Sequence, residues 1–128
     1  MAVTEFLTTD DVLEIHRDQI RVYGGSDGIR DVGLLESALA QPPAAFSGVR
    51  LHTDLFEMAA AYLFHLVQNH PFIDGNKRVG LEAALLFLEI NDHSLEVEDD
   101  ALIDLVLATA QGQLTKAAIA EFFRQHAE

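Results

Sequence analysis

The sequence contains no cysteine and no tryptophan, and it has only 8 basic residues against 21 acidic ones. Without cysteine the chain can form no disulfide, no thiolate nucleophile and no cysteine-ligated metal site, which fits a reducing compartment. The formal net charge of −13 repels the phosphates of nucleic acids and anionic lipids over most of the surface. We therefore expect no direct binding of nucleic acid, and we expect either a basic partner or a small positive pocket within an acidic field.

Long hydrophobic runs are also missing. Polar residues interrupt the most apolar segments before any of them reaches the length of a membrane span: Glu57, His65, Gln68, Glu82 and Glu89. The first residues lack the basic flank and the apolar stretch of a signal peptide. A chain of 128 residues, 49% of them hydrophobic, is therefore expected to form a single domain, residues 1–128, that is cytoplasmic and has no membrane segment.

Signals for helix starts recur along the chain. Thr8 and Asp11 have the spacing of a capping box. Asp31 is predicted to cap a short helix, and Thr53 is predicted to cap the next one. The periodicity predicts helices over about 9–21, after 31, and over 53–69, 76–90, 98–111 and 115–126. The glycine-rich segment 23–31 suits a turn or hairpin, and the segment that ends near residue 51 suits a loop.

The expected fold is therefore all-α, and its two most apolar helices flank residues 70–78, which read HPFIDGNKR. Gly75 lets the backbone of this stretch approach a ligand closely. The amides at residues 75–77 begin a predicted helix, where unpaired N–H groups and the helix dipole attract phosphate. Lys77 and Arg78 add two cations, and arginine can bind phosphate oxygens with a fork of donors. The stretch therefore predicts a phosphate site.

His70 and Asp74 supply the remaining chemistry of the stretch. A lone carboxylate beside bound phosphates suits Mg²⁺, which takes few protein ligands. His70 is the only side chain of the stretch that takes up a proton near neutral pH. A base, a metal ligand and a phosphate cradle indicate transfer of a phosphorus group from a nucleotide to a hydroxyl. The simpler interpretations are that His70 only interacts with a helix dipole and that Asp74 only caps the next helix.

The same stretch resembles the signature of the Fic/Doc family, and of its Doc (death-on-curing toxin) branch, H-x-F-x-[DN]-[AG]-N-K-R, at every fixed position. Further similarity lies in YGG at 23–25, DLFE at 54–57 and ALLFL at 84–88. The resemblance extends over nearly the whole chain. It implies an all-α Fic-fold helical bundle with a small β-hairpin flap, expected at residues 23–31, which aligns a target peptide by strand addition.

The resemblance also implies a role for each residue of the motif. The implied catalytic residues are His70, Asp74, Lys77 and Arg78. The implied nucleotide-binding residues, which would hold the phosphates of ATP, are Gly75, Asn76, Lys77 and Arg78. Among these, His70 would be the general base and Asp74 would bind Mg²⁺. Phe72 would pack inward and hold the shape of the loop.

Two positions depart from the broader Fic pattern, HPFxxGNGRxxR, of enzymes that transfer AMP. Lys77 replaces its second glycine, and Leu81 replaces its distal arginine. A lysine fills the space in which phosphates would rest on bare backbone, and the missing arginine removes a second phosphate clamp. The Doc resemblance implies reversed ATP and a kinase that phosphorylates a threonine or serine of a translation factor of the elongation factor Tu class, halting translation. AMP transfer and a catalytically idle binding module are the alternatives.

The resemblance also bears on inhibition. Many Fic enzymes carry an inhibitory helix, [ST]-x-x-x-E-[GN]; residues 53–57 have the spacing, but Met58 follows. We therefore expect inhibition in trans by a Phd-like antitoxin, whose basic or amphipathic tail would suit the charge of −13. The remaining histidines show no metal-ligand spacing, and His65 and Glu57 are predicted to be structural.

Overall fold

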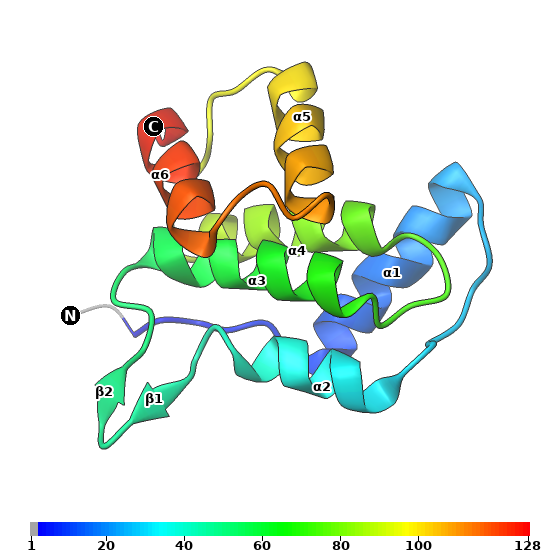
Figure 1. The fold of residues 1–128 in the computed structure, drawn as a ribbon, viewed down its shortest axis with the longest axis horizontal. Coiled ribbons are helices and arrows are strands. Elements are labelled where there is room, and N and C mark those ends of the chain that lie inside the picture. Colours follow the sequence, from blue (N-terminus) through cyan, green and yellow to red (C-terminus); the bar gives the residue numbers. More distant parts are fainter. Residues whose placement is uncertain (1–2) are drawn as a thin grey trace.

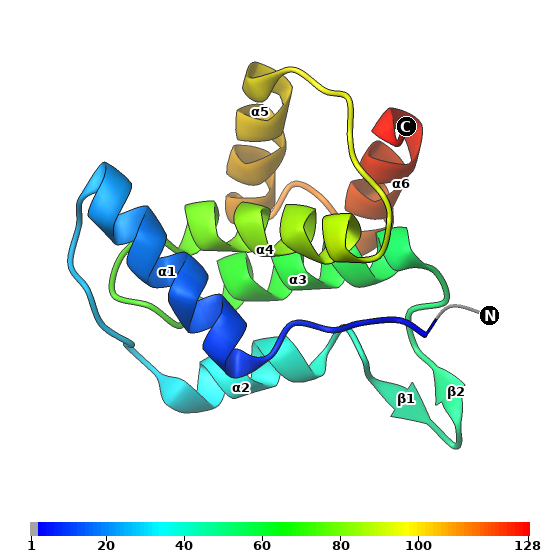
Figure 2. The ribbon, with the colours of Figure 1, turned by 180° about the vertical axis from the view of Figure 1, so that it is seen from behind.

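The computed structural model describes residues 3–128. Within that range lie six helices and one two-stranded antiparallel sheet, shown in Figure 1 and from behind in Figure 2. In chain order the elements are α1 (Thr9–Tyr23), α2 (Val32–Ala40), β1 (Ala45–Phe46), β2 (Val49–Arg50), α3 (Leu55–Asn69), α4 (Asn76–Ile90), α5 (Asp99–Ala110) and α6 (Lys116–His126). The all-α prediction is confirmed, and α4 begins and ends at the predicted residues.

The antiparallel helices α3 and α4 form the centre of the molecule (Figure 1). Helices α2 and α6 pack on α3, α1 packs on α4, and α5 contacts both. Gly80 allows the two central helices to approach closely, because a Cβ there would lie 2.9 Å from Val67 Cγ2 and 3.3 Å from the Leu63 carbonyl oxygen. This packing determines where the connecting loop, residues 70–75, emerges from the core.

The core also anchors the N-terminal segment. The buried Tyr62 hydroxyl accepts a hydrogen bond from the Leu7 N–H at 2.9 Å, and burial raises the pKa of Tyr62 to about 12. The Tyr62 ring packs against Phe87 of α4, with ring centroids 5.1 Å apart. Phe6 also stacks on Phe87, with ring centroids 5.7 Å apart, so the segment before α1 is held to both central helices. No helix within residues 3–128 has the length and apolar character needed to cross a membrane.

The helix caps follow the predictions with one exception. Thr8 and Asp11 form the capping box of α1, and Asp31 caps α2. The prediction that Thr53 caps α3 is wrong: Asp54 is the N-cap and accepts the Glu57 N–H at 2.8 Å. Both residues satisfy the local rule for an N-cap. Asp54 also forms an ion pair at 2.8 Å with Arg124 of α6, which holds its carboxylate in place.

The predicted positions of the hairpin and the loop were wrong. Residues 24–31 form no hairpin, because their backbone pairs with the α3–α4 loop instead; Ile29 forms an antiparallel bridge with Phe72. The β-hairpin lies at residues 45–50, where a loop was predicted, with Ser47 and Gly48 both at positive φ (51° and 79°) in its turn. Both views place this hairpin beside the start of α3, away from the loop at its end (Figures 1 and 2).

Candidate functional site

The predicted site residues gather around one cleft of about 640 Å³ at the junction of α3 and α4. The cleft is lined by Val67, His70, Ile73, Asp74, Gly75, Asn76, Lys77, Arg78 and Ala110. Six of these are the predicted catalytic and nucleotide-binding residues. The sequence did not predict the other three, Val67 of α3, Ile73 of the loop and Ala110 of α5, which supply apolar walls. All six predicted residues are thus brought together.

His70 enters the cleft from the C-terminal end of α3. It occupies the left-handed region of the backbone, with φ 51° and ψ 53°, which ends the helix and turns the chain toward α4. The guanidinium of Arg30 donates to the His70 carbonyl oxygen at 2.7 Å and to the Asn69 carbonyl oxygen at 3.0 Å. Carbonyls at a helix end lack intrahelical donors, so Arg30 satisfies two of them and holds the backbone that carries the imidazole.

Two inward-facing side chains hold the shape of the loop. Phe72 is 1% exposed and stacks on the buried His16 ring, with centroids 4.0 Å apart, so the prediction that Phe72 packs inward is confirmed. The buried Asn76 amide accepts from the Phe72 N–H and donates to the Phe72 carbonyl oxygen, both at 2.9 Å. The Asn76 side chain therefore bridges the loop, with its amide oxygen and its amide nitrogen both bonded to the Phe72 backbone.

Asp74 is exposed beside the glycine-rich segment that precedes α2. Its Oδ2 accepts a hydrogen bond from the Ser26 N–H at 2.7 Å, and its carbonyl oxygen accepts from His16 Nε2 at 2.9 Å. Gly25 sits against this carboxylate at φ 113°, where a Cβ would lie 3.3 Å from the Asp74 Cβ. The simpler interpretation of Asp74 as a helix cap is wrong, because Gly75 is the N-cap of α4.

The N-terminus of α4 has the character of an anion site. Gly75 adopts a left-handed conformation, with φ 86°, and no side chain caps the helix, so the first amides face the cleft without a capping acceptor. Lys77 is exposed there. The guanidinium of Arg78 lies 5.1 Å from the Tyr23 ring centroid and donates to the Gly24 carbonyl oxygen at 3.4 Å. Dipole, amides and two cations together favour bound phosphate.

The donor set of the cleft bears on the metal that it could hold. Residues 3–128 contain no group of three or more histidine, cysteine or acidic side chains placed to bind one ion. Asp74 is the single carboxylate that lines the cleft. One carboxylate beside a phosphate cradle suits Mg²⁺, whose remaining ligands are phosphate oxygens and water. It does not suit zinc, which needs three or four protein ligands.

Sequence reasoning missed Arg30, Ser26 and His16, all of which position motif residues. Their partners lie 40, 48 and 58 residues away along the chain, so no local pattern could have revealed them.

Comparison with known proteins identifies the family of this chain. Residues 6–88, which include the cleft loop, match the sequence profile of the Fic/DOC family. The chain is 41% identical over 98 residues to the protein named Toxin Doc of Mycolicibacterium smegmatis, covering 77% of this chain and 73% of that one. It is 33% identical over 120 residues to the protein named Protein kinase doc of Escherichia phage P1, covering 93% of each. The chain therefore belongs to the Fic/DOC family.

Proposed function

We propose that this chain is a toxin kinase that uses Mg-ATP to phosphorylate a threonine or serine hydroxyl on a protein target. The observation that carries the proposal is the meeting of one imidazole, His70, with the uncapped and cation-flanked N-terminus of α4 in a single cleft. The names of the two relatives, one a toxin and the other a protein kinase, support it. The proposed target class is a translation factor such as elongation factor Tu, which places the action in the cytoplasm.

Each part of the cleft has a chemical task in this proposal. The phosphates of the nucleotide lie on the first amides of α4 and between the side chains of Lys77 and Arg78. His70 accepts the proton of the target hydroxyl, and the hydrogen bonds from Arg30 keep its backbone in position. Asp74 would hold Mg²⁺, which neutralises phosphate charge when bound. Positioning and charge neutralisation account for most of the rate in reactions of this class.

The orientation of the nucleotide separates a kinase from an AMP transferase. Lys77 lies at the start of α4, so its ammonium and not bare backbone meets the phosphate nearest the helix. Leu81, one turn along the same helix, is apolar and supplies no second clamp. We infer from both that the γ-phosphate, which carries the most charge, is presented to the hydroxyl.

The experiment that tests the proposal asks which phosphate of ATP is transferred to the target. Purified chain, Mg²⁺ and elongation factor Tu are incubated with γ-labelled or α-labelled ATP, beside His70→Ala and the matched control His93→Ala, which lies outside the cleft. Label from the γ position that disappears only in His70→Ala supports the kinase. Label from the α position identifies AMP transfer and refutes the orientation argument. ATP binding without transfer from either position would indicate an idle module or another target.

We also propose that a separate, Phd-like antitoxin restrains this activity. The net charge of −13 suits a partner with a basic or amphipathic segment. The purified chain should therefore act without any partner and lose activity when such a segment is added. A chain that is inactive alone, although it binds ATP and its target, would contradict this expectation.

A further inference from the structure

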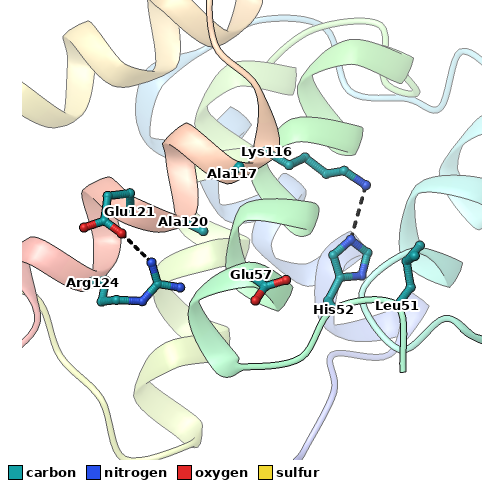
Figure 3. Close-up of a pocket in the computed structure, with 8 residues that line it drawn as sticks. All are labelled: Leu51, His52, Glu57, Lys116, Ala117, Ala120, Glu121 and Arg124. Atoms are coloured by element: carbon teal, nitrogen blue, oxygen red, sulfur yellow. Dashed lines mark hydrogen bonds and ion pairs between the residues drawn. The ribbon is translucent and has the colours of Figure 1, made fainter. Parts of the chain in front are cut away.

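A second cavity, of about 580 Å³, lies between α6, the start of α3 and the segment before α3 (Figure 3). Its lining residues are Leu51, His52, Glu57, Lys116, Ala117, Ala120, Glu121 and Arg124. It shares no lining residue with the cleft at His70. The proposed kinase chemistry uses none of its side chains, so its polar groups require a separate explanation.

The amine of Lys116 is the central feature of this cavity. Lys116 is the first residue of α6, and its side chain reaches across the cavity to His52 (Figure 3). Its Nζ lies 3.2 Å from His52 Nε2 and 3.1 Å from His65 Nε2. In its charged form Lys116 has only donors, so both Nε2 atoms then accept from it and both rings then carry their proton on Nδ1. The ring of Phe64 lies on a further side, with its centroid 6.0 Å from Nζ.

No carboxylate offsets the charge of this ammonium. Within residues 3–128, Lys116 takes part in no ion pair. The Glu57 carboxylate accepts from the Thr53 hydroxyl at 2.7 Å. Glu121, the other acidic residue lining the cavity, pairs at 2.6 Å with Arg124, which also binds Asp54. The acidic groups around the cavity are therefore engaged elsewhere, and Lys116 faces neutral acceptors.

The surroundings favour the uncharged amine. Burial lowers the pKa of Lys116. Burial, followed by the charge of Lys116, lowers the pKa of His65 to about 4 and that of His52 below its usual value, although Glu57 opposes the latter shift. Both imidazoles are therefore neutral near neutral pH. The position of Lys116 in the first turn of α6 acts in the same direction, because the positive end of the helix dipole disfavours a cation there.

We propose that Lys116 is a nucleophilic amine and an acceptor site for acyl groups from activated donors such as acyl phosphates. The ammonium first loses one proton to solvent, which leaves the neutral amine beside His52 Nε2 and His65 Nε2. The free Nζ then attacks the carbonyl carbon of the donor, so that a C–N bond forms while the C–O bond to phosphate breaks. The second proton lost by Nζ leaves with the phosphate, and the product is an amide at Lys116.

Acylation would alter the contacts that Lys116 makes. An ammonium has three N–H donors, whereas an acylated nitrogen has one, so the product can hydrogen-bond to His52 or His65 but not to both. The modification also removes a charge from the first turn of α6.

The composition of the chain provides an internal control. Lys77 and Lys116 are its only lysines, and Lys77 is exposed at the other site. The probe is the N-hydroxysuccinimide ester of acetic acid, which is neutral and is therefore not attracted to the cationic cleft. Peptide mass spectrometry follows acetylation of both lysines over time near neutral pH. We expect Lys116 to react several-fold faster than Lys77, with the difference narrowing above the ordinary lysine pKa of about 10.4.

A variant then tests the cause of the reactivity. His65→Glu places a carboxylate beside the ammonium and favours its charged form. The acetylation rate of Lys116 should therefore fall to that of Lys77 or below it. His93→Glu makes the same charge change outside the cavity and should leave the ratio of the two rates unaltered. Circular dichroism confirms that both variants are folded, and Lys77 in each sample reports the probe concentration. A wild-type Lys116 no faster than Lys77, or a ratio preserved in folded His65→Glu, would overturn the proposal.

Discussion

Replacing Asn76 with alanine tests whether this side chain shapes the loop between α3 and α4. In the structure the Asn76 amide makes two hydrogen bonds of 2.9 Å to the backbone of Phe72, and both residues are buried. Alanine would leave the Phe72 N–H and carbonyl oxygen without partners. Each such buried group costs about 1–3 kcal/mol, so the free energy of unfolding should fall by about 2–6 kcal/mol.

This loss is large enough to measure in two ways. For a chain of 128 residues, an unfolding entropy of about 2.1 cal/mol/K per residue makes 1 kcal/mol equal to about 4 °C in Tm, so we expect a decrease of about 8–24 °C. Calorimetry gives Tm, and urea titration gives the free energy of unfolding. Nucleotide binding should also weaken when it is measured below the Tm of the variant, because the loop that carries the cleft residues has lost its bridge.

Two further variants make the test specific. Asn91→Ala removes an asparagine that bonds to the backbone of Glu5 and Phe87 outside the cleft, so it should lower stability but retain phosphoryl transfer. Lys77→Ala removes an exposed cation and should weaken ATP binding at unchanged Tm. Asn76→Ala could instead lose nucleotide binding while its Tm stays within about 2 °C of the wild type. That result would show that the side chain contacts the nucleotide and that its bridge to Phe72 does not stabilise the loop.

Three other perturbations have definite expected outcomes. Arg30→Ala removes two hydrogen bonds to the carbonyls that end α3, so steady-state kinetics should show a lower kcat at nearly unchanged KM for ATP; an unchanged kcat would show that the His70 backbone needs no such support. Gly80→Val forces a side chain against Val67, and urea unfolding should show a loss of about 1–3 kcal/mol unless the two central helices separate without cost. Burial lowers the pKa of His65 to about 4 from 6.5, so the unfolded chain binds more protons as pH falls through this window and stability declines. In His65→Gln this decline should flatten, and an unaltered pH profile of stability would contradict the assignment.

Much of the fold could be predicted because its signals are local. The bounds of α4 and the caps at Thr8 and Asp31 depend on residues a few positions apart, whose periodicity and capping chemistry can be read along the chain. The six predicted site residues lie together in sequence between two buried helices, so the geometry of one loop brings them into one cleft. For these features, the residues that decide the structure are also neighbours in the sequence.

The remaining features depended on contacts between distant residues. The segment 24–31 formed no hairpin because the α3–α4 loop offered its backbone other partners, and Asp54 became the cap of α3 with a carboxylate held by Arg124 of α6. The inward turn of Asn76 and the meeting of Lys116 with two histidines likewise required the packed chain. The sequence by itself thus determined the helices and the chemical groups of the cleft. Tertiary structure alone decided which polar groups are buried and paired, because a hydrogen bond between segments tens of residues apart leaves no periodic trace in either of them.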